Sequence, residues 1–207
     1  MKNKLIINIG RQIGSGGYDI AKLLAKAFDC QFYDKELLNL AAKKSGFSEK
    51  FFEQNDEQRS FLKSHLPFHL PFIGNNAFYK NRLSPESLYL FQSDVIREAA
   101  DSNMRCVFLG RTADYILRDH KECINIFITA NIEDRIQNIC QRKGCNEDEA
   151  HRIIENGENE RRKYYNYYTG KVWGAAESYD LIINISCLGL EETTNLITEF
   201  IRKKYTK

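Results

Sequence analysis

The sequence is short of the features that mark membrane, secreted and nucleic-acid-binding proteins. It contains no run of about 18 apolar residues, the length that a membrane-spanning helix requires. Its formal net charge of +2 is too small to attract nucleic acid through bulk electrostatics. The N-terminus lacks the long apolar stretch and the cleavage site of a signal peptide. These absences predict a cytoplasmic protein that acts on small molecules, with neither a membrane nor a nucleic acid as its partner.

The cysteines are scattered along the chain, and the few prolines are confined to one segment. The cysteines form no C-x-x-C pair, so we expect reduced thiols and no zinc site at Cys30, Cys106, Cys123, Cys140, Cys145 and Cys187. All three prolines lie in a loosely patterned stretch, which predicts a partly helical inserted segment at 48–87. His65 and His69 have the spacing of a metal pair on a helix, but Pro67 between them disfavours a regular helix.

Residues 5–24, LIINIGRQIGSGGYDIAKLL, combine a strand, a glycine-rich turn and a helix. The apolar run at 5–9 is typical of a buried parallel strand, and the apolar residues from Ile20 to Ala27 recur at helical spacing. The turn between them holds Gly10, Gly14, Gly16 and Gly17. Glycines allow the backbone to approach an anion closely, and a helix N-terminus offers unpaired amides. The stretch therefore predicts a phosphate-binding loop; a glycine-rich turn that binds nothing is the alternative.

The loop departs from the Walker A pattern G-x-x-x-x-G-K-[ST]. With Gly16 as the second glycine of the pattern, Gly17 stands at the lysine position, Tyr18 at the hydroxyl position and Arg11 at the first glycine. We hypothesise that Arg11 supplies the missing positive charge from the other end of the loop. Asp19 is the nearest oxygen ligand for a phosphate-bound magnesium ion; its alternative role is to stabilise the helix N-terminus.

The rest of the chain alternates strand and helix patterns. We expect further strands at 31–34, 105–110, 124–129 and 180–185, and helices at 35–44, 88–100, 131–143, 146–163 and 190–203. A short helix is expected to begin near Thr112. The helix at 146–163 is expected to break or bend at Gly157 and to run into the tyrosine-rich segment 164–168, which suits a core or dimer contact. The alternation predicts an α/β fold with a parallel sheet of about five strands.

Two groups of cations fall where such a fold binds ligands. Arg111 comes just after a predicted strand, at the carboxyl edge where α/β folds place ligand contacts, although it could be an ordinary surface cation. Arg161, Arg162 and Lys163 form the densest basic cluster. Phosphoryl transfer requires neutralisation of the transferred oxygens, commonly by arginines on a closing segment. The alternative for this cluster is a solvated helix face.

The segments RQIGSGGYDIAKLLA, FYDKELL, FLGRTADYIL, FITANIEDRI and RRKYYNYYTGKVWG, in this order, resemble the cytidylate kinase-like family. The resemblance extends from residue 6 to 197. It implies a P-loop NTPase-type three-layer sandwich with a central parallel sheet in a single domain, 1–207. It also implies a nucleotide-monophosphate-binding insertion at 48–87 and a lid segment at 144–175. ATP and Mg²⁺ would be the donor and the cofactor, and a homodimer is left open.

Together with the roles that the loop pattern gives to Arg11 and Asp19, the resemblance gives the following candidates. The donor phosphates and ATP would be bound by Gly14, Ser15, Gly16, Gly17, Tyr18, Asp19 and Arg142, with Asp19 also as the magnesium ligand. The acceptor would be bound by Asp34, Lys35 and Arg111, and catalysis would depend on Arg11, Arg161 and Arg162. Three departures fall in this site: the missing loop lysine, Lys35 at a serine position and Thr112 at an aspartate position. They put cytidine monophosphate in doubt as the acceptor.

The sequence thus predicts a kinase that moves the γ-phosphoryl group of ATP onto a nucleoside monophosphate or a similar small acceptor. Two alternatives stay open. The altered loop suits a nucleotide-binding sensor or regulator without catalysis. Lys35 and Thr112 suit a kinase for a small molecule that is not a nucleotide.

Overall fold

A computed structural model describes residues 4–35, 38–39, 85–103 and 105–205 of the chain. The chain divides into two compact units, one made of 1–34 with 103–207 and the other of 35–102. The described part of the second unit contains one long helix, α4 (Pro85–Ser102). Most of the insertion expected at 48–87, with His65 and His69, and most of the helix expected at 35–44 lie outside the described residues.

The first unit is built on a parallel sheet of five strands in the order β2-β3-β1-β4-β5. The strands are β1 (Leu5–Arg11), β2 (Gln31–Tyr33), β3 (Arg105–Leu109), β4 (Cys123–Thr129) and β5 (Leu181–Asn184). Ile7 of β1 lies opposite Val107 of β3 and Ile124 of β4. The β-branched runs read from the sequence are thus the buried centre of the sheet, as expected for strands covered on both faces. The predicted α/β class is confirmed.

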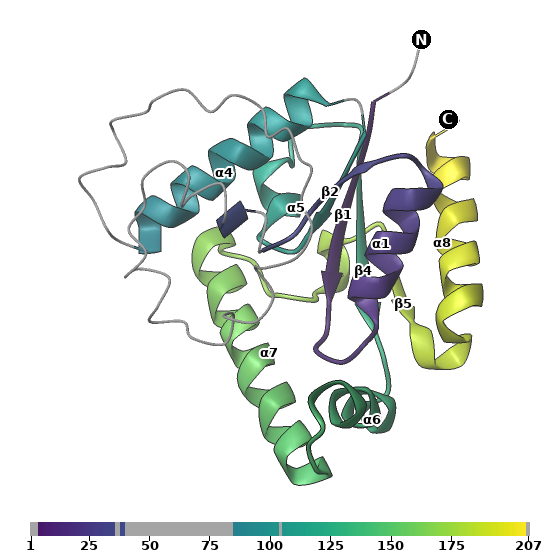
Figure 1. Ribbon diagram of the computed structural model, residues 1–207. Coiled ribbons are helices and arrows are strands. Elements are labelled where there is room, and N and C mark those ends of the chain that lie inside the picture. The colour runs from purple at the N-terminus through teal and green to yellow at the C-terminus, as the bar shows by residue number, and fades with distance from the viewer. Residues whose placement is uncertain (1–3, 36–37, 40–84, 104, 206–207) are drawn as a thin grey trace. The chain divides into compact units, whose positions relative to one another are not determined.

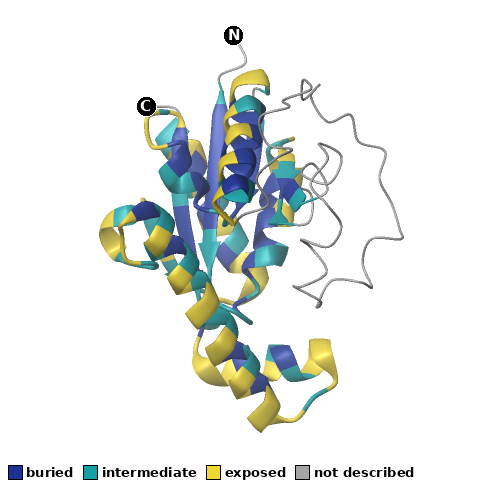
Figure 2. Cartoon of the chain, turned by 90° about the vertical axis from the view of Figure 1, so that its left-hand side faces the viewer, coloured by how far each residue is buried: buried dark blue, intermediate teal, exposed yellow. Residues whose placement is uncertain are grey.

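Helices α1 (Gly17–Ala27) and α8 (Gly189–Tyr205) lie side by side against one face of the sheet (Figure 1). Their inward faces, among them Leu24 and Ile197, share one hydrophobic core with strands β1, β3 and β4. Figure 2 shows the resulting pattern, in which the strands are buried and exposed residues line the outer faces of the helices. The short helix α5 (Ala113–Ile116) follows β3, and two 3-10 turns, Ala176–Ser178 and Ile185–Cys187, flank β5.

Helices α6 (Ile132–Lys143) and α7 (Glu147–Thr169) extend beyond the carboxyl ends of the strands (Figure 1). They pack on each other through a small hydrophobic cluster of their own: Ile136, Ile139, Ala150 and Ile154. The expected interruption at Gly157 is not found, because α7 runs without a break through this residue and through the tyrosine-rich segment to Thr169. The glycine serves close packing instead, since a Cβ atom there would lie 3.2 Å from the side chain of Ile13.

Within the described ranges, the structure contains no helix that is both long and apolar enough to cross a membrane. All six cysteines are described and carry free thiols. Burial raises the pKa of the Cys30, Cys106 and Cys123 thiols to about 12, which keeps them protonated at neutral pH.

Candidate active site

The glycine-rich loop between β1 and α1 adopts a conformation that only its glycines permit without strain. Gly14 and Gly16 have φ angles of +78° and +73°, in the left-handed region that side chains rarely adopt. Gly16 is the N-cap of α1, and no side chain caps the helix there. Within the part of the chain that the structure describes, no hydrogen bond occupies the amides of Gly14, Gly16 and Gly17. The loop therefore offers free N–H groups at a helix N-terminus, the arrangement that binds phosphate.

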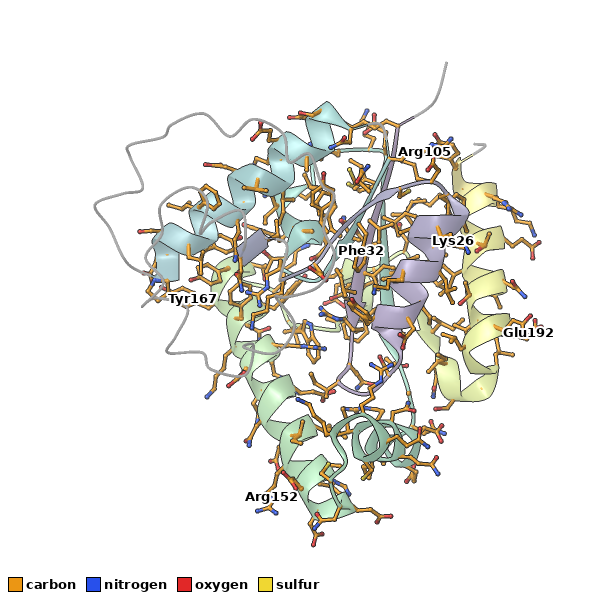
Figure 3. The ribbon with its side chains drawn as sticks, in the orientation of Figure 1. Lys26, Phe32, Arg105, Arg152, Tyr167 and Glu192 are labelled. Carbon is orange, nitrogen blue, oxygen red and sulfur yellow. The ribbon has the colours of Figure 1, made fainter. Side chains whose placement is uncertain are left out.

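Two loop side chains brace the turn. The buried Ser15 hydroxyl donates to the Gln12 carbonyl at 3.0 Å, and the Gln12 side chain accepts from the Ala130 amide at 3.3 Å. The ring of Tyr18 packs edge-on against Phe32, labelled in Figure 3, with ring centroids 5.9 Å apart. The Ser15 contact thus lies within the loop, the Gln12 contact ties the loop to the residue after β4, and the Tyr18 contact packs α1 against β2.

The stem of Arg11 lies beside Gly17, which stands at the position of the missing lysine. A Cβ atom built at Gly17 would lie 2.5 Å from Cβ and 3.0 Å from Cγ of Arg11, so the arginine stem occupies the space where a side chain at position 17 would begin. Its guanidinium lies against Gly110, where a Cβ atom would collide with Nη1. The Arg11 side chain thus runs from the glycine-rich loop to the turn after β3, and this path requires glycine at both positions.

Further arginines surround this path. Arg161 of α7 donates from Nη1 to the carbonyl oxygen of Arg11 at 2.7 Å. Burial, reinforced by the charges of Arg111 and Arg135, lowers the pKa of Arg161 to about 10, while Glu158 acts in the opposite direction. Burial lowers the pKa of Arg135 as well. Cations held together at such a cost are typical of a site that receives a polyanion.

The turn after β3 is strained. Gly110, Arg111 and Thr112 have φ angles of +71°, +57° and +54°, so three consecutive residues are left-handed. For the β-branched Thr112 this is a rare conformation, of the kind that concentrates at functional sites. The Thr112 hydroxyl donates to the Arg111 carbonyl at 2.7 Å, and the Arg111 guanidinium lies 5.0 Å from the centre of the Tyr164 ring. The turn directs Arg111 towards α7, on the same side as Arg161.

A hydrogen bond between a carboxylate and a tyrosine joins α5 to α7. Tyr165 donates its hydroxyl to Asp114 Oδ2 at 2.6 Å. Burial raises the pKa of the Asp114 carboxyl, although the hydrogen bond from Tyr165 opposes the shift. Burial and the charge of Asp114 raise the pKa of Tyr165. This contact fixes the C-terminal half of α7 to the segment that carries Arg111.

Asp19 and Arg142, expected to bind magnesium and ATP, form an ion pair with each other across the loop. The charge of Asp19 is therefore balanced by an arginine. The residue also lies in the first turn of α1, where a negative charge is favourable. No group of three or more His, Cys, Asp or Glu side chains suited to a metal exists among the described residues. Mg²⁺ that accompanies a nucleotide takes only one or two protein carboxylates and completes its shell with phosphate oxygens and water, so Asp19 as its ligand stays a prediction.

The other predicted residues take separate places. Arg162 is exposed and donates to Asn159 of its own helix at 2.8 Å. Asp34 directly follows β2, at the same edge of the sheet as the loop, and its charge acts on Lys22 of α1. Lys35 belongs to the second unit. The structure thus brings together Arg11, Arg111 and Arg161 around the loop.

Three residues next to the loop were missed from the sequence. Arg135 Nε donates to the Ile13 carbonyl at 2.8 Å, Asn138 Nδ2 donates to the Gly14 carbonyl at 2.9 Å, and Glu158 Oε1 accepts from the Ile13 amide at 3.3 Å. The partners are more than 100 positions apart, so periodicity could not reveal them. The available signal was Gly157, because a glycine inside a helical pattern often marks close packing.

Comparisons with known proteins support the fold. An uncharacterised protein from Eubacterium ventriosum ATCC 27560 has a similar structure, with a TM-score of 0.74 and 26% identity over 96% of this chain and 99% of that one. Shikimate kinases from Bacteroides thetaiotaomicron and Acinetobacter baumannii share the fold, with TM-scores of 0.52 and 0.53. The Bacteroides thetaiotaomicron enzyme is 12% identical over 96% of this chain and 98% of its own. The Acinetobacter baumannii enzyme is 13% identical over 99% of this chain and 96% of its own. A comparison with curated proteins gave no match.

The sequence itself gives the more specific result. The model of the cytidylate kinase-like family matches residues 6–187, which include the glycine loop, Arg111 and Arg161. The family and the P-loop kinase fold together support a phosphotransferase. The chain is a member of the cytidylate kinase-like family.

Proposed function

We propose that the protein is a kinase that transfers the γ-phosphoryl group of ATP to a nucleoside monophosphate or to a similar small acceptor. The observation that carries the proposal is the glycine loop, whose free amides stand beside an arginine in the space of the usual lysine. Backbone amides, a helix N-terminus and one fixed cation are the elements with which P-loop proteins hold a polyphosphate.

The donor and the acceptor would lie on the two sides of the Arg11 guanidinium. The loop amides hold the β- and γ-phosphates of ATP, and Arg11 replaces the positive charge of the lysine. Arg111, at the carboxyl end of β3, binds the phosphate of the acceptor, and Asp34 and Lys35 are further acceptor-side candidates. The proximity of the Arg11 guanidinium to Gly110 supports this placement, because the same cation then lies between the two phosphates.

Catalysis follows from positioning and charge. An oxygen of the acceptor phosphate attacks the γ-phosphorus, the bond from that phosphorus to the bridging oxygen breaks, and ADP leaves with the electron pair. An acceptor phosphate is already ionised, so no general base is required. Arg161 neutralises the charge that spreads over the transferred oxygens. Mg²⁺ bound with ATP would supply further positive charge to the phosphates, with Asp19 as the residue that would hold it.

The test is a coupled assay that detects ADP with each common nucleoside monophosphate as the acceptor. Arg161→Ala should reduce kcat by roughly 10³-fold, the lower range for an arginine at the transferred phosphoryl group. Arg152→Ala is the matched control, because Arg152 is an exposed arginine on the same helix and should leave kcat unchanged. A decrease of the same size in both variants would refute the role of Arg161.

The same assay separates the alternatives. Tight binding of ATP without turnover of any acceptor would support a sensor, which the absence of the loop lysine favours. Turnover with a small alcohol and none with a nucleoside monophosphate would make the protein a kinase for a non-nucleotide substrate. Thermal shift with a panel of acceptors identifies the class first, because a ligand that binds the native state raises the melting temperature.

A further inference from the structure

Ile13 of the glycine-rich loop contacts both α6 and α7. Its side chain packs against the hydrophobic cluster of the two helices and lies at contact distance from Gly157. Its amide donates to Glu158 of α7, and its carbonyl accepts from Arg135 of α6. One loop residue thus uses its side chain and both of its backbone groups to bind α6 and α7.

The two side chains that hold this peptide also hold each other. Arg135 Nη2 and Glu158 Oε1 form an ion pair, with side-chain exposures of 7% and 14%. A pair this far from water is specific in its geometry, and loss of one partner leaves a buried charge. The arginine needs two different nitrogens for its two contacts, Nε for Ile13 and Nη2 for Glu158, so a lysine could not replace it.

The neighbouring peptide is held in the same way. Asn138 donates to the Gly14 carbonyl at 2.9 Å, and a Cβ atom at Gly14 would lie 2.6 Å from the carbonyl oxygen of Arg135. Side chains of α6 thus bind the carbonyl oxygens of both residues 13 and 14. The amides that follow, at 16 and 17, are left without a partner in the described part of the chain.

We propose that Glu158 and Arg135 are positioning residues, which hold the donor loop in its anion-binding shape by clamping the Ile13 peptide to α6 and α7. The identity of the anion rests on the proposed function, since it is taken to be the polyphosphate of ATP. The clamp itself is a property of the protein without ligand. Loss of the Glu158 carboxylate should loosen the loop and reduce its affinity for ATP.

The experiment compares Glu158→Gln with Asp180→Asn. Asp180 is a matched control, because its carboxylate also accepts from a backbone amide, that of Asn125 at 2.8 Å, and pairs with a cation, Lys204. It precedes β5, at the opposite edge of the sheet from the loop. Both variants lose an ion pair and part of an amide contact, so a general loss of stability affects both.

The first measurement is amide hydrogen exchange over residues 12–18 without nucleotide. We expect roughly 10-fold faster exchange in Glu158→Gln and no change in Asp180→Asn, with the β1 amides unaffected in both. Unchanged exchange in Glu158→Gln would overturn the clamp, whatever the protein phosphorylates. Should Glu158→Gln fail to fold, Ile13→Val, which removes a single methyl group from the same contact, replaces it with the same expected direction.

The second measurement is the Kd for ATP. Glu158→Gln should raise it by roughly 10- to 100-fold, in line with the effect of misplacing a binding group, while Asp180→Asn leaves it within a factor of two. Tighter binding in Glu158→Gln would show that the carboxylate competes with phosphate and would overturn the proposal. If the wild type binds ATP but phosphorylates no acceptor, the proposed function fails, and the clamp is still decided by exchange and affinity.

Discussion

The packing of Arg11 against Gly17 predicts that an alanine at position 17 lowers the stability of the protein. In Gly17→Ala the new methyl group would lie 2.5 Å from Cβ of Arg11 and 3.4 Å from Cβ of Ile128. Gly17 has no positive φ angle, so the effect is steric and does not come from the backbone. Overpacking of this kind costs about 1–3 kcal/mol. For a chain of this size, that corresponds to a melting temperature lower by roughly 2–12 °C.

The double variant distinguishes this cause from others. Arg11→Gly removes the atoms that the methyl group meets, so Arg11→Gly with Gly17→Ala should be less destabilised than the sum of the single variants, by about 1–2 kcal/mol. Urea unfolding of the four proteins, with midpoints compared at an unchanged m-value, measures the coupling. Additivity within about 0.5 kcal/mol would refute the claim that Arg11 occupies the space of a side chain at position 17.

The same pair tests the chemical role of the arginine. Arg11→Gly should weaken ATP binding by roughly 10- to 150-fold, which corresponds to the loss of one charge-assisted hydrogen bond of about 1.5–3 kcal/mol. Gly17→Lys in the Arg11→Gly background returns a cation to the loop and should recover most of the affinity. In the wild-type background, Gly17→Lys should instead behave like Gly17→Ala, because the arginine stem still blocks it. Tighter binding of ATP by Gly17→Lys in the wild-type background would contradict the structure.

Two further predictions concern the loop and the lid. Gly14→Ala should cost about 2–5 kcal/mol, because it combines left-handed strain with contact against the Arg135 carbonyl; Gly144→Ala, with a φ of +67° and open space, should show the strain alone. Equal losses in urea unfolding would disprove the contact. Because the folded state raises the pKa of Asp114, its stabilising contribution is complete below the usual 3.8 and is lost as pH rises through the raised value. Asp114→Asn, which still accepts from Tyr165, should therefore be more stable than wild type at pH 7, and melting curves should show this gain shrink to nothing as the pH is lowered.

Local patterns were sufficient for the elements of the fold. The apolar run at 5–9, the helical spacing after Ile20 and the alternation that follows each depend on neighbours in sequence, and each is found in the structure. The free amides of the loop followed from its glycines. The failure at Gly157 has a physical cause: glycine costs a helix only about 1 kcal/mol, and the missing Cβ leaves room for Ile13.

The candidate site could be predicted only where chemistry is local. Arg11 follows from the position of the missing lysine, yet its dependence on Gly110 joins residues that are 99 positions apart and appears only in three dimensions. Glu158 and Arg135 look like ordinary charges on polar helix faces until the loop is placed between them. The ion pair between Asp19 and Arg142 likewise depends on the fold, because the two residues are far apart in the sequence.

Helix α7 connects the two ends of the proposed reaction. Near its middle, Glu158 and Arg161 contact the donor loop; one to two turns later, Tyr164 and Tyr165 contact Arg111 and Asp114. A rigid rod attached at both places transmits a displacement from one to the other. Occupancy of either end should therefore alter the affinity of the other, and thermodynamic reciprocity requires the two factors to be equal. The order in which the two substrates are added would then leave the ternary complex unchanged, while each would report on the presence of the other.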